Sequence, residues 1–312
     1  MLNIDKLQIN SNFLLAPMSG VTDYPYREIV KKFKPGLVFS EMIASRALLT
    51  QNSKTIKMIK KTDNYISAIQ IAGCDPKVMA EAAKICEDSG ADIIDINMGC
   101  PVKKVVNGYA GSALMKDEIL ATKILESVSA SVKVPVTLKM RKGWDDNSLN
   151  APKIAKIAEN SGIKMITIHG RTRCQMYRGN ADWKFVKNVK KNVRIPVLVN
   201  GDITNNQNLD QALKDSGADG VMIGRGTYGR PWIFEELSSS INYKINYKLK
   251  KEIILNHFQL SLDHYGKDIG LKSFRKHLGW YSKSINNSNE FRSKINQCTD
   301  EIVLKNLIND FF

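Results

Sequence analysis

The feature that most constrains the fold of this 312-residue chain is a repeated alternation of short apolar segments with amphipathic ones. Eight apolar segments predict β-strands at residues 13–16, 37–40, 67–71, 93–97, 136–139, 165–169, 197–200 and 220–223. Helices are predicted between them, among others at residues 76–89, 117–131, 151–161 and 205–216. Eight such units within about 235 residues predict a closed (β/α)8 TIM barrel over residues 1–237. An open doubly wound sheet is the alternative, but no GxGxxG turn follows the first segment.

Polar residues and glycines gather where the predicted strands end. Together with the neighbouring Pro17 and Met18, they are Ser19, Gln70, Asn97, Lys139, Arg141, His169, Arg171, Arg173, Asn200, Gly201, Asp202, Gly224 and Arg225. The carboxyl ends of all strands in such a barrel meet at one face, which is where barrel enzymes keep their active sites. Any single residue of this set is also compatible with an ordinary turn. Their recurrence after the strands predicts a site at that face.

The segments after the last two strands predict a phosphate site. Asn200-Gly201-Asp202 and Gly224-Arg225-Gly226 provide glycines for close backbone approach and an arginine for a bidentate contact. In TIM barrels a phosphate often lies between these two loops. Lys139, at the end of the fifth strand, faces the predicted barrel mouth, and a buried lysine there needs an anionic partner. A reduced flavin would supply such a partner.

The stretch 92–101, DIIDINMGCP, places a cysteine at the mouth of the fourth strand. Pro101 stiffens the turn beside Cys100, which makes Cys100 a candidate acid or nucleophile. A buried structural thiol is the alternative. The following residues 101–114 are basic, then glycine-rich, then apolar, an order that predicts a mobile lid over an anionic substrate.

The net charge and the cysteine content indicate which partners and which cellular compartment the protein has. The formal net charge is +15, which favours a polyanion such as nucleic acid, although drift in composition is the alternative explanation. The five cysteines have no CxxC spacing, which predicts a reducing compartment without disulfides and without a metal site of the zinc-ribbon type. No signal-peptide pattern and no membrane-spanning run are present. We expect a cytoplasmic monomer that binds neither metal nor membrane.

From residue 238 onward the pattern changes to a helical tail. Residues 238–240 and the Asn/Lys/Tyr-rich segment after them predict a linker, and 251–265, 271–285 and 301–312 predict helices. Lys272, Arg275 and Lys276 recur at helical spacing near Trp280 and Tyr281. An RNA-facing surface and an ordinary solvated face with an aromatic packing anchor are both compatible with this pattern.

Nine motifs spread over nearly the whole chain carry a family resemblance. They are APMSGVTD (16–23), SEM (40–42), QIAG (70–73), DINMGCP (95–101), AGSAL (110–114), TLK (137–139), IHGRT (168–172), NGDI (200–203) and MIGR (222–225). With these motifs the chain resembles the tRNA-dihydrouridine synthase family, and most closely its bacterial B-type branch. The resemblance implies an FMN-binding (β/α)8 barrel followed by a tRNA-binding helical domain at residues 238–312. Residues 104–109 are less basic than the lid expected for that family.

The resemblance also implies an activity and roles for residues. NADPH or NADH would reduce FMN, the flavin N5 would give a hydride to C6 of a tRNA uridine, and Cys100 would protonate C5. Asn97 would bind the uracil. The residues implied to hold the cofactor are Pro17, Met18, Ser19, Gln70, Lys139, His169, Asn200, Gly201, Asp202, Gly224 and Arg225. The tRNA contacts predicted from the pattern of charge are Arg141, Arg171, Arg173, Lys272, Arg275 and Lys276. The alternatives are a small-molecule flavin reductase and a non-enzymatic RNA-binding protein.

Overall fold

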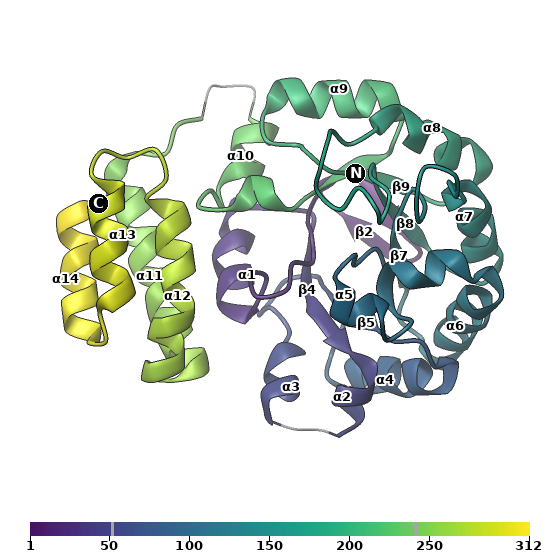
Figure 1. Ribbon diagram of the computed structural model, residues 1–312, viewed down its shortest axis with the longest axis horizontal. Helices are drawn as coiled ribbons and strands as arrows, with labels where there is room; N and C mark the ends of the chain where they lie inside the picture. The colour runs from purple at the N-terminus through teal and green to yellow at the C-terminus, as the bar shows by residue number, and fades with distance from the viewer. Residues whose placement is uncertain (51–52, 240–242) are drawn as a thin grey trace. The chain divides into compact units, whose positions relative to one another are not determined.

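The structure, a computed structural model, describes residues 1–50, 53–239 and 243–312. Packing divides the chain into two compact units. The barrel unit comprises Met1–Asp23 and Pro35–Gly224, and the helical unit comprises Tyr24–Lys34 and Arg225–Phe312. Figure 1 follows both units along the chain from purple to yellow.

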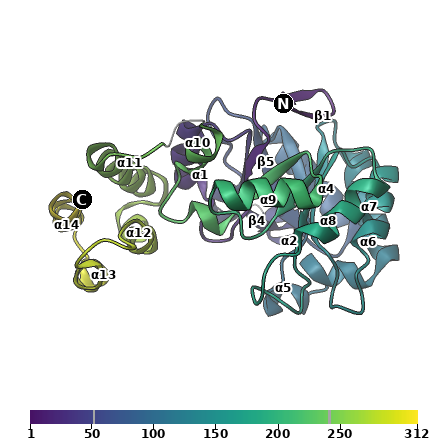
Figure 2. The same ribbon diagram turned by 90° about the horizontal axis from the view of Figure 1, so that it is seen from above.

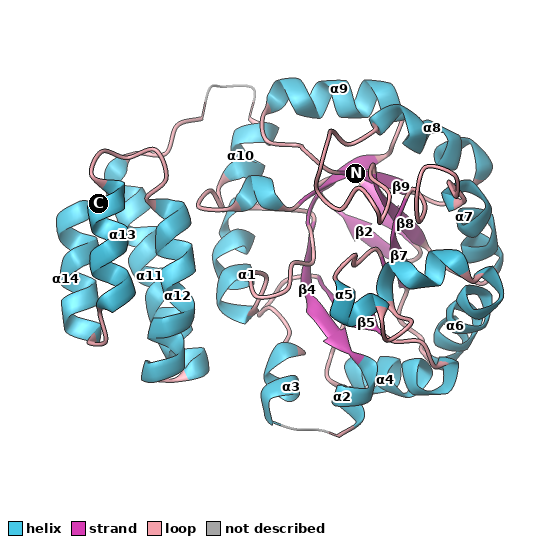
Figure 3. Ribbon diagram, viewed as in Figure 1, coloured by secondary structure: helices cyan, strands magenta, loops and turns pink. Residues whose placement is uncertain are grey.

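The barrel unit is built on a closed barrel of parallel strands, which confirms the predicted TIM barrel. The strands are β3 (Phe13–Leu15), β4 (Leu37–Ala44), β5 (Ser67–Ala72), β6 (Ile93–Met98), β7 (Val136–Arg141), β8 (Met165–His169), β9 (Val197–Asn200) and β10 (Gly220–Ile223). They pair in chain order, and β10 closes the ring against β3. Figure 3 shows these strands inside a ring of helices. The predicted limits of the last three strands match the structure, whereas β4 continues to Ala44 instead of ending at residue 40.

The helices of the barrel unit follow the strands and pack their apolar faces on them. They are α2 (Ser45–Leu49), α3 (Ser53–Met58), α4 (Pro76–Asp88), α5 (Lys103–Val106), the 3-10 helix η2 (Gly111–Lys116), α6 (Glu118–Ser131), α7 (Ala151–Asn160), α8 (Trp183–Asn192) and α9 (Asn206–Ser216). Side chains before α4 and α8 fix where they begin. Asp75 accepts hydrogen bonds from two backbone N–H groups of α4, and Asp182 accepts one from Phe185.

A hairpin closes the amino-terminal end of the barrel. Strands β1 (Leu2–Ile4) and β2 (Leu7–Ile9) pair antiparallel, and Leu2, Ile4 and Ile9 are buried in one cluster with residues of the barrel interior. Figure 2 places β1 and α5 on opposite sides of the barrel. The end of the barrel covered by the hairpin is therefore apolar, and the polar strand ends lie at the other end.

The helical unit contains α1 (Tyr24–Val30), the 3-10 helices η1 (Lys31–Phe33) and η3 (Arg225–Thr227), α10 (Ile233–Ser238), α11 (Tyr247–Tyr265), α12 (Lys267–Tyr281), α13 (Ser288–Gln297) and α14 (Glu301–Phe311). The division predicted at residue 237 differs from this packing, which groups residues 24–34 and 225–237 with the tail. The predicted helix at 271–285 begins and ends earlier, and α13 was not predicted because its sequence is mostly polar. Part of the predicted linker, from Ser240, lies outside the described residues.

The interior of the helical unit holds two histidines among aromatic rings. His257 and His277 are buried with their ring centroids 4.6 Å apart, and His257 Nδ1 lies 3.1 Å from Tyr281 Oη. Burial, with Lys276 nearby, lowers the pKa of His257 to about 3, and burial also lowers the pKa of His277 well below 6.5. Both histidines are therefore neutral at pH 7.

Among the helices that the structure describes, none combines the length and the apolar composition needed to cross a bilayer.

Candidate active site

The candidate site is built on Asp95, a carboxylate buried inside the barrel. The strand register places Gln70, Asp95 and Thr137 on one level of three neighbouring strands. Gln70 Nε2 donates to Asp95 Oδ2 at 2.6 Å, and Thr137 Oγ1 donates to Asp95 Oδ1 at 2.6 Å. Both carboxylate oxygens are thereby satisfied, as a buried charge requires. The acid fixes the orientation of Gln70.

A chain of hydrogen bonds runs from Gln70 to the turn that carries Cys100. Asn97 Nδ2 donates to Gln70 Oε1 at 2.7 Å. Asn97 Oδ1 accepts the backbone N–H groups of Gly99 at 3.1 Å and of Cys100 at 2.9 Å. The carbonyl of Asn97 is therefore committed to the turn, and the second amide hydrogen is the donor that Asn97 offers a ligand. The predicted contact of Asn97 with the uracil stays a prediction, and it would use this second amide hydrogen.

The turn at Cys100 is also braced from the segment that follows it. The carbonyl of Cys100 accepts from the Ser112 backbone N–H at 3.1 Å and from Ser112 Oγ at 2.8 Å. Gly111 has φ of 62°, and a Cβ there would come within 2.9 Å of the Cys100 carbonyl oxygen. Only glycine fits this position. Cys100 is half-buried, in contrast to Cys86, whose thiol pKa burial raises to about 12. An inert structural thiol matches Cys86 better than Cys100.

Lys139 lies beside this network, close enough to Asp95 for each charge to affect the pKa of the other group. It pairs in register with Asn97 on the neighbouring strand. Burial and then the nearby Arg141 lower the pKa of Lys139 to about 8, while Asp95 and Cys100 act in the opposite direction. Within the described part of the chain, its ammonium group makes no hydrogen bond. A half-buried cation of this kind fits the electron-rich edge of a reduced flavin.

The pKa of Asp95 moves toward that of Lys139. Burial raises the pKa of Asp95 to about 6, although its bonds to Thr137 and Gln70 and the charge of Lys139 lower it. The two groups thus titrate on either side of pH 7. A buried acid and base with pKa values displaced toward neutrality are typical of active sites.

The ends of the first and last barrel strands form a second part of the site. A Cβ at Gly224 would lie 3.4 Å from Met18 Sδ and 3.5 Å from the Cβ of Ala16, so the segment 17–19 runs directly beside Gly224. Pro17 and Met18 are half-buried, and Ser19 is exposed. Arg225 follows Gly224 in the chain, begins η3 and is exposed.

The loop after β9 is tightly packed against β8. Gly201 has φ of 118°, and a Cβ there would lie 2.8 Å from the Cβ of Ala181 and 3.3 Å from His169 Cε1. Asn200 Nδ2 donates to the carbonyl of Met222 at 2.7 Å, which ties β9 to β10. A backbone that only glycine can adopt, beside His169, fits the close approach of a phosphate or a ribityl chain.

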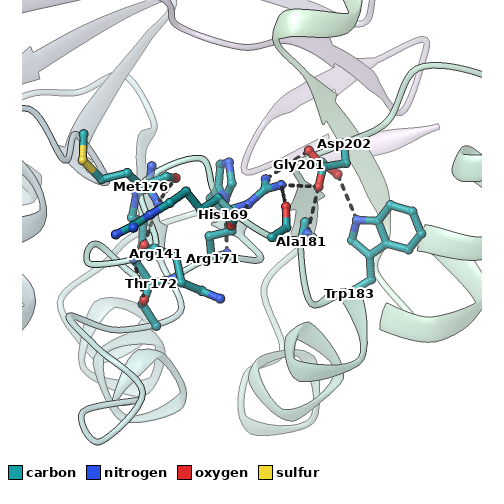
Figure 4. Close-up of polar contacts among 12 residues, drawn as sticks. Arg141, His169, Arg171, Thr172, Met176, Ala181, Trp183, Gly201 and Asp202 are labelled. Carbon is teal, nitrogen blue, oxygen red and sulfur yellow. Dashed lines mark hydrogen bonds and ion pairs between the residues drawn. The ribbon is translucent and has the colours of Figure 1, made fainter.

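Arg171, which is buried, and Asp202, which is half-buried, form an ion pair that differs from two of the predicted roles (Figure 4). Arg171 Nη1 donates to Asp202 Oδ1 at 3.0 Å, and Nη2 donates to Oδ2 at 2.6 Å. Arg171 is 2% exposed and also donates to the carbonyls of Arg178 and Gly179. Arg171 is therefore a clamp for its loop and not an exposed tRNA contact. The carboxylate of Asp202 serves this clamp, so its side chain is not directed to a phosphate.

Arg141 is likewise committed to the protein. It is 2% exposed, donates from Nε to the Gly99 carbonyl at 2.9 Å, and donates from Nη1 to the carbonyls of Thr172 at 2.7 Å and Met176 at 2.8 Å (Figure 4). Burial, with the nearby charges of other arginines, lowers its pKa to about 10. Arg141 therefore ties the loop after β8 to the turn at Cys100, and the predicted direct contact with tRNA does not fit its burial.

The remaining predicted tRNA contacts differ in exposure. Arg173 is half-buried, and its guanidinium carbon lies 4.7 Å from the ring centroid of Trp144. Arg275 is half-buried and donates to the carbonyl of Cys298, the residue that follows α13. This contact ties α12 to the end of α13. Lys272 and Lys276 are exposed one turn apart on α12. The two lysines can meet a polyanion as predicted, whereas Arg275 has a structural contact instead.

Two contributors to the site were not assigned a role from the sequence. Asp95 and Thr137 are buried in strands whose other residues are mostly apolar. The signal was present in the alternation of Asp95 and Asn97 with isoleucine, because residues two apart face the same side of a strand. Among the described residues, no cluster of three or more His, Cys, Asp or Glu side chains is arranged to hold a metal ion.

The fold and the site together define a TIM-barrel enzyme, with its titratable groups at the carboxyl ends of the strands. The family described as Dihydrouridine synthase (Dus) matches residues 14–312. A curated protein from Rickettsia bellii (strain RML369-C), called "Probable tRNA-dihydrouridine synthase", is 52% identical over 100% of this chain and 98% of its own length. The chain belongs to the dihydrouridine synthase family.

A further relative supports this assignment, and solved structures share the fold. The "tRNA-dihydrouridine synthase B" of Vibrio vulnificus (strain CMCP6) is 42% identical over 95% of this chain and 94% of its own, which confirms the predicted likeness to the B-type branch. Among solved structures, histamine dehydrogenase from Rhizobium sp. 4-9 has a TM-score of 0.60 at 13% identity, covering 83% of this chain and 50% of that one. Morphinone reductase has a TM-score of 0.56 at 11% identity, covering 80% and 91%. At such identities these likenesses show the fold alone.

Proposed function

We propose that this protein is an FMN-dependent enzyme that uses NADPH to reduce the C5–C6 double bond of a uridine in tRNA, giving 5,6-dihydrouridine. The names of its relatives support the substrate. The observation that carries the chemistry is the position of Lys139, which makes no hydrogen bond among the described residues and pairs in register with Asn97, the residue whose side chain braces the turn at Cys100.

Residues at the carboxyl ends of the strands would hold the flavin. Lys139 and Gln70 would meet its polar edge, and Pro17, Met18 and Ser19 would line it. The residues that would bind the ribityl chain and the phosphate are His169, Asn200, Gly201, Gly224 and Arg225. When bound, FMN supplies a hydride equivalent to C6 of the uracil. Asp202 contributes indirectly, because it positions the loop that carries Gly201 through its pair with Arg171.

Cys100 supplies the proton of the reaction. Its Sγ–H transfers the proton to C5 while the hydride arrives at C6, so the double bond gains one hydride and one proton. Thiols are ordinarily protonated near neutral pH, which suits a general acid. Asn97 orients this step in two ways, since its carbonyl holds the backbone at Cys100 and its second amide hydrogen is available to the uracil.

The net charge of +15 and the helical unit account for the choice of a polynucleotide over a free base. A uridine must leave its stack to reach a buried site, which costs a few kcal/mol and calls for binding energy elsewhere on the RNA. Lys272 and Lys276 on α12 supply part of it. We expect the enzyme to act as a monomer in the cytoplasm, where tRNA is modified.

The test is to purify the protein, identify the bound flavin, and incubate the protein with NADPH and unmodified tRNA transcripts. We expect a yellow protein that releases FMN on denaturation, and dihydrouridine at one position by nucleoside mass spectrometry. Free uridine serves as the comparison substrate. Reduction of free uridine but not of tRNA would identify a small-molecule reductase. A colourless protein that binds tRNA without taking up FMN would identify an RNA-binding protein without this activity.

A further inference from the structure

Tyr109 is an exposed aromatic residue in a backbone conformation that aromatic residues rarely adopt. Its side chain is 74% exposed, and its φ is 55°. In the described part of the chain the ring and the hydroxyl make no hydrogen bond, ring contact or ion pair. A left-handed residue after a short helix is usually glycine. Gly108 stands one position earlier, so the chain places the tyrosine where glycine would be less strained.

The backbone around Tyr109 is well anchored, so the exposure of the ring does not reflect a loose segment. The Tyr109 N–H donates to the Val106 carbonyl at 3.0 Å, and the Ala110 N–H donates to the Val105 carbonyl at 3.3 Å. These bonds continue the turn of α5. Two residues later, Gly111 packs against the carbonyl of Cys100. Because consecutive Cα atoms are about 3.8 Å apart, the Tyr109 Cα lies within about 7.6 Å of the Gly111 Cα.

Positive charge accompanies the ring in the same segment. Lys103 and Lys104 are exposed on α5, which begins three residues after Cys100. In Figure 2, α5 lies on the side of the barrel away from the hairpin, which is the side of the polar strand ends. An exposed ring beside cations is the arrangement with which proteins hold unpaired nucleotides, the ring against a base and the cations along the backbone.

We propose that Tyr109 stacks on the nucleotide next to the target uridine and takes the place that the uridine leaves when it moves out of the stack. This inference rests on the proposed function for the identity of the RNA. A base that loses its neighbour loses stacking energy, and a rigid ring at that point restores part of it. The strained backbone then has a reason, because it directs the ring away from the barrel and toward the RNA.

The test compares tRNA affinity for three substitutions at this position. Tyr109→Ala should weaken binding of an unmodified tRNA transcript by roughly 5- to 150-fold, which corresponds to the 1–3 kcal/mol typical of base–aromatic stacking. Tyr109→Phe keeps the ring and should bind like the wild-type protein. Tyr109→Gly should lose the same affinity as Tyr109→Ala and be at least as stable to heat as the wild type, because glycine relieves the left-handed strain. FMN content and NADPH oxidation should not change in any of the three.

Val102→Ala is the matched control, because Val102 is an exposed apolar residue of the same segment without a ring. A transcript with 2-aminopurine beside the target uridine reports stacking directly. We expect its fluorescence to change on binding to the wild type and to Tyr109→Phe but not to Tyr109→Ala. Equal affinities of wild type and Tyr109→Ala would refute the stacking role, as would an effect limited to NADPH oxidation. If the wild type forms no dihydrouridine while Tyr109→Ala still loses tRNA affinity, the proposed function fails, and Tyr109 is an RNA contact without a role beside a target uridine.

Discussion

The barrel unit and the helical unit each bury a cluster of titratable side chains, and the two clusters are built on different rules. In the barrel unit, Asp95 and Lys139 carry opposite charges, and their pKa values of about 6 and about 8 lie close to neutrality. In the helical unit, His257 and Tyr281 have their pKa values driven away from neutrality by burial, to about 3 and well above 10.

The difference in pKa distinguishes a cluster that can take part in chemistry from one that only supports the fold. Both clusters are buried, so burial alone does not identify chemistry. The histidines and Tyr281 stay uncharged throughout the physiological range and pack as aromatic rings around one another. The barrel cluster keeps a cation without a hydrogen-bond acceptor among the described residues, next to a thiol on a braced turn. Buried charges with pKa values near neutrality are typical of an active site, whereas neutral rings in contact with one another indicate packing.

The largest effect should come from the thiol. Cys100→Ala should lower turnover on tRNA by roughly 10²–10⁴-fold, the usual contribution of a positioned general acid. FMN content and flavin reduction by NADPH should stay unchanged, because Cys100 is assigned to neither. Cys174→Ala is the control, since Cys174 is exposed. If Cys100→Ala has nearly wild-type turnover, Cys100 is a structural residue, as the buried histidines of the helical unit are. The two clusters would then not differ in function.

Lys139→Met should show opposite effects on cofactor and on stability. Reduced FMN should bind about 10- to 150-fold more weakly, the loss expected for a charge-assisted hydrogen bond of about 1.5–3 kcal/mol. Its midpoint potential should shift by about 30–60 mV to more negative values. Without FMN the variant should be more stable at pH 7 by about 2–3 kcal/mol, because burial destabilises the ammonium group by more than Asp95 stabilises it.

Potentiometric titration and urea unfolding of the apoprotein measure these two effects. Lys184→Met on the exposed side of α8 is the control and should leave both unchanged. Loss of apoprotein stability in Lys139→Met would mean that Lys139 supports the fold, as the histidines do in the helical unit.

The histidine pair should make the helical unit sensitive to acid. Because the folded-state pKa of His257 is about 3, below the value of 6.5 for an unfolded chain, the unfolded chain takes up the proton first as the pH falls. The contribution is therefore fully present above about pH 6.5 and is lost toward pH 3, by about 1.4 kcal/mol per pH unit for each histidine.

Urea unfolding between pH 7.5 and 4.5 tests this loss. His277→Phe, which keeps a ring of similar size, should flatten the pH dependence by about 1.4 kcal/mol per unit below pH 6.5. His264→Asn, at a half-buried position, is the control. Identical slopes for the wild type and His277→Phe would show that the pair is already charged in the folded protein, and the two clusters would no longer differ in kind.

The smallest effect concerns the outer face of the helical unit. Lys272→Ala with Lys276→Ala should weaken tRNA binding modestly and reduce the slope of log affinity against log salt by about 0.7–0.9 for each phosphate that the protein no longer neutralises. Lys187 and Lys191 provide a matched pair, because they are exposed one turn apart on α8. If both double variants behave alike, the lysines of α12 form an ordinary solvated face.

The sequence predicted the barrel well because its signal is local. Strands β8, β9 and β10 have the predicted limits, since each is a short apolar run that ends at a polar residue or a glycine. β4 extends further than predicted, because it continues through Glu41 with a shift in register between Phe39 and Met42. From the sequence alone, a charged residue such as Glu41 looks the same whether it ends a strand or lies inside one.

The partners of the predicted site residues were harder to foresee. Arg141 and Arg171 stand at strand ends as expected, yet their guanidinium groups bind carbonyl groups and a carboxylate inside the protein. Pattern and charge are the same for an arginine that faces RNA and for one that clamps a loop. Asp95 shows the converse, because its importance lies in its hydrogen bonds with Gln70 and Thr137, which belong to other strands.

The grouping of α1 with the helical unit has a consequence for synthesis on the ribosome. All seven residues of α1 are buried, and Tyr24 and Tyr26 pack against His264 and His257 of α11. The rest of the helical unit begins at Arg225, about 190 residues after η1. At 5–20 residues per second, translation separates the two by about 10–40 s. During that interval the aromatic and aliphatic side chains of α1 lack the residues that bury them, so we expect chaperones to recognise α1 while the barrel is still being made.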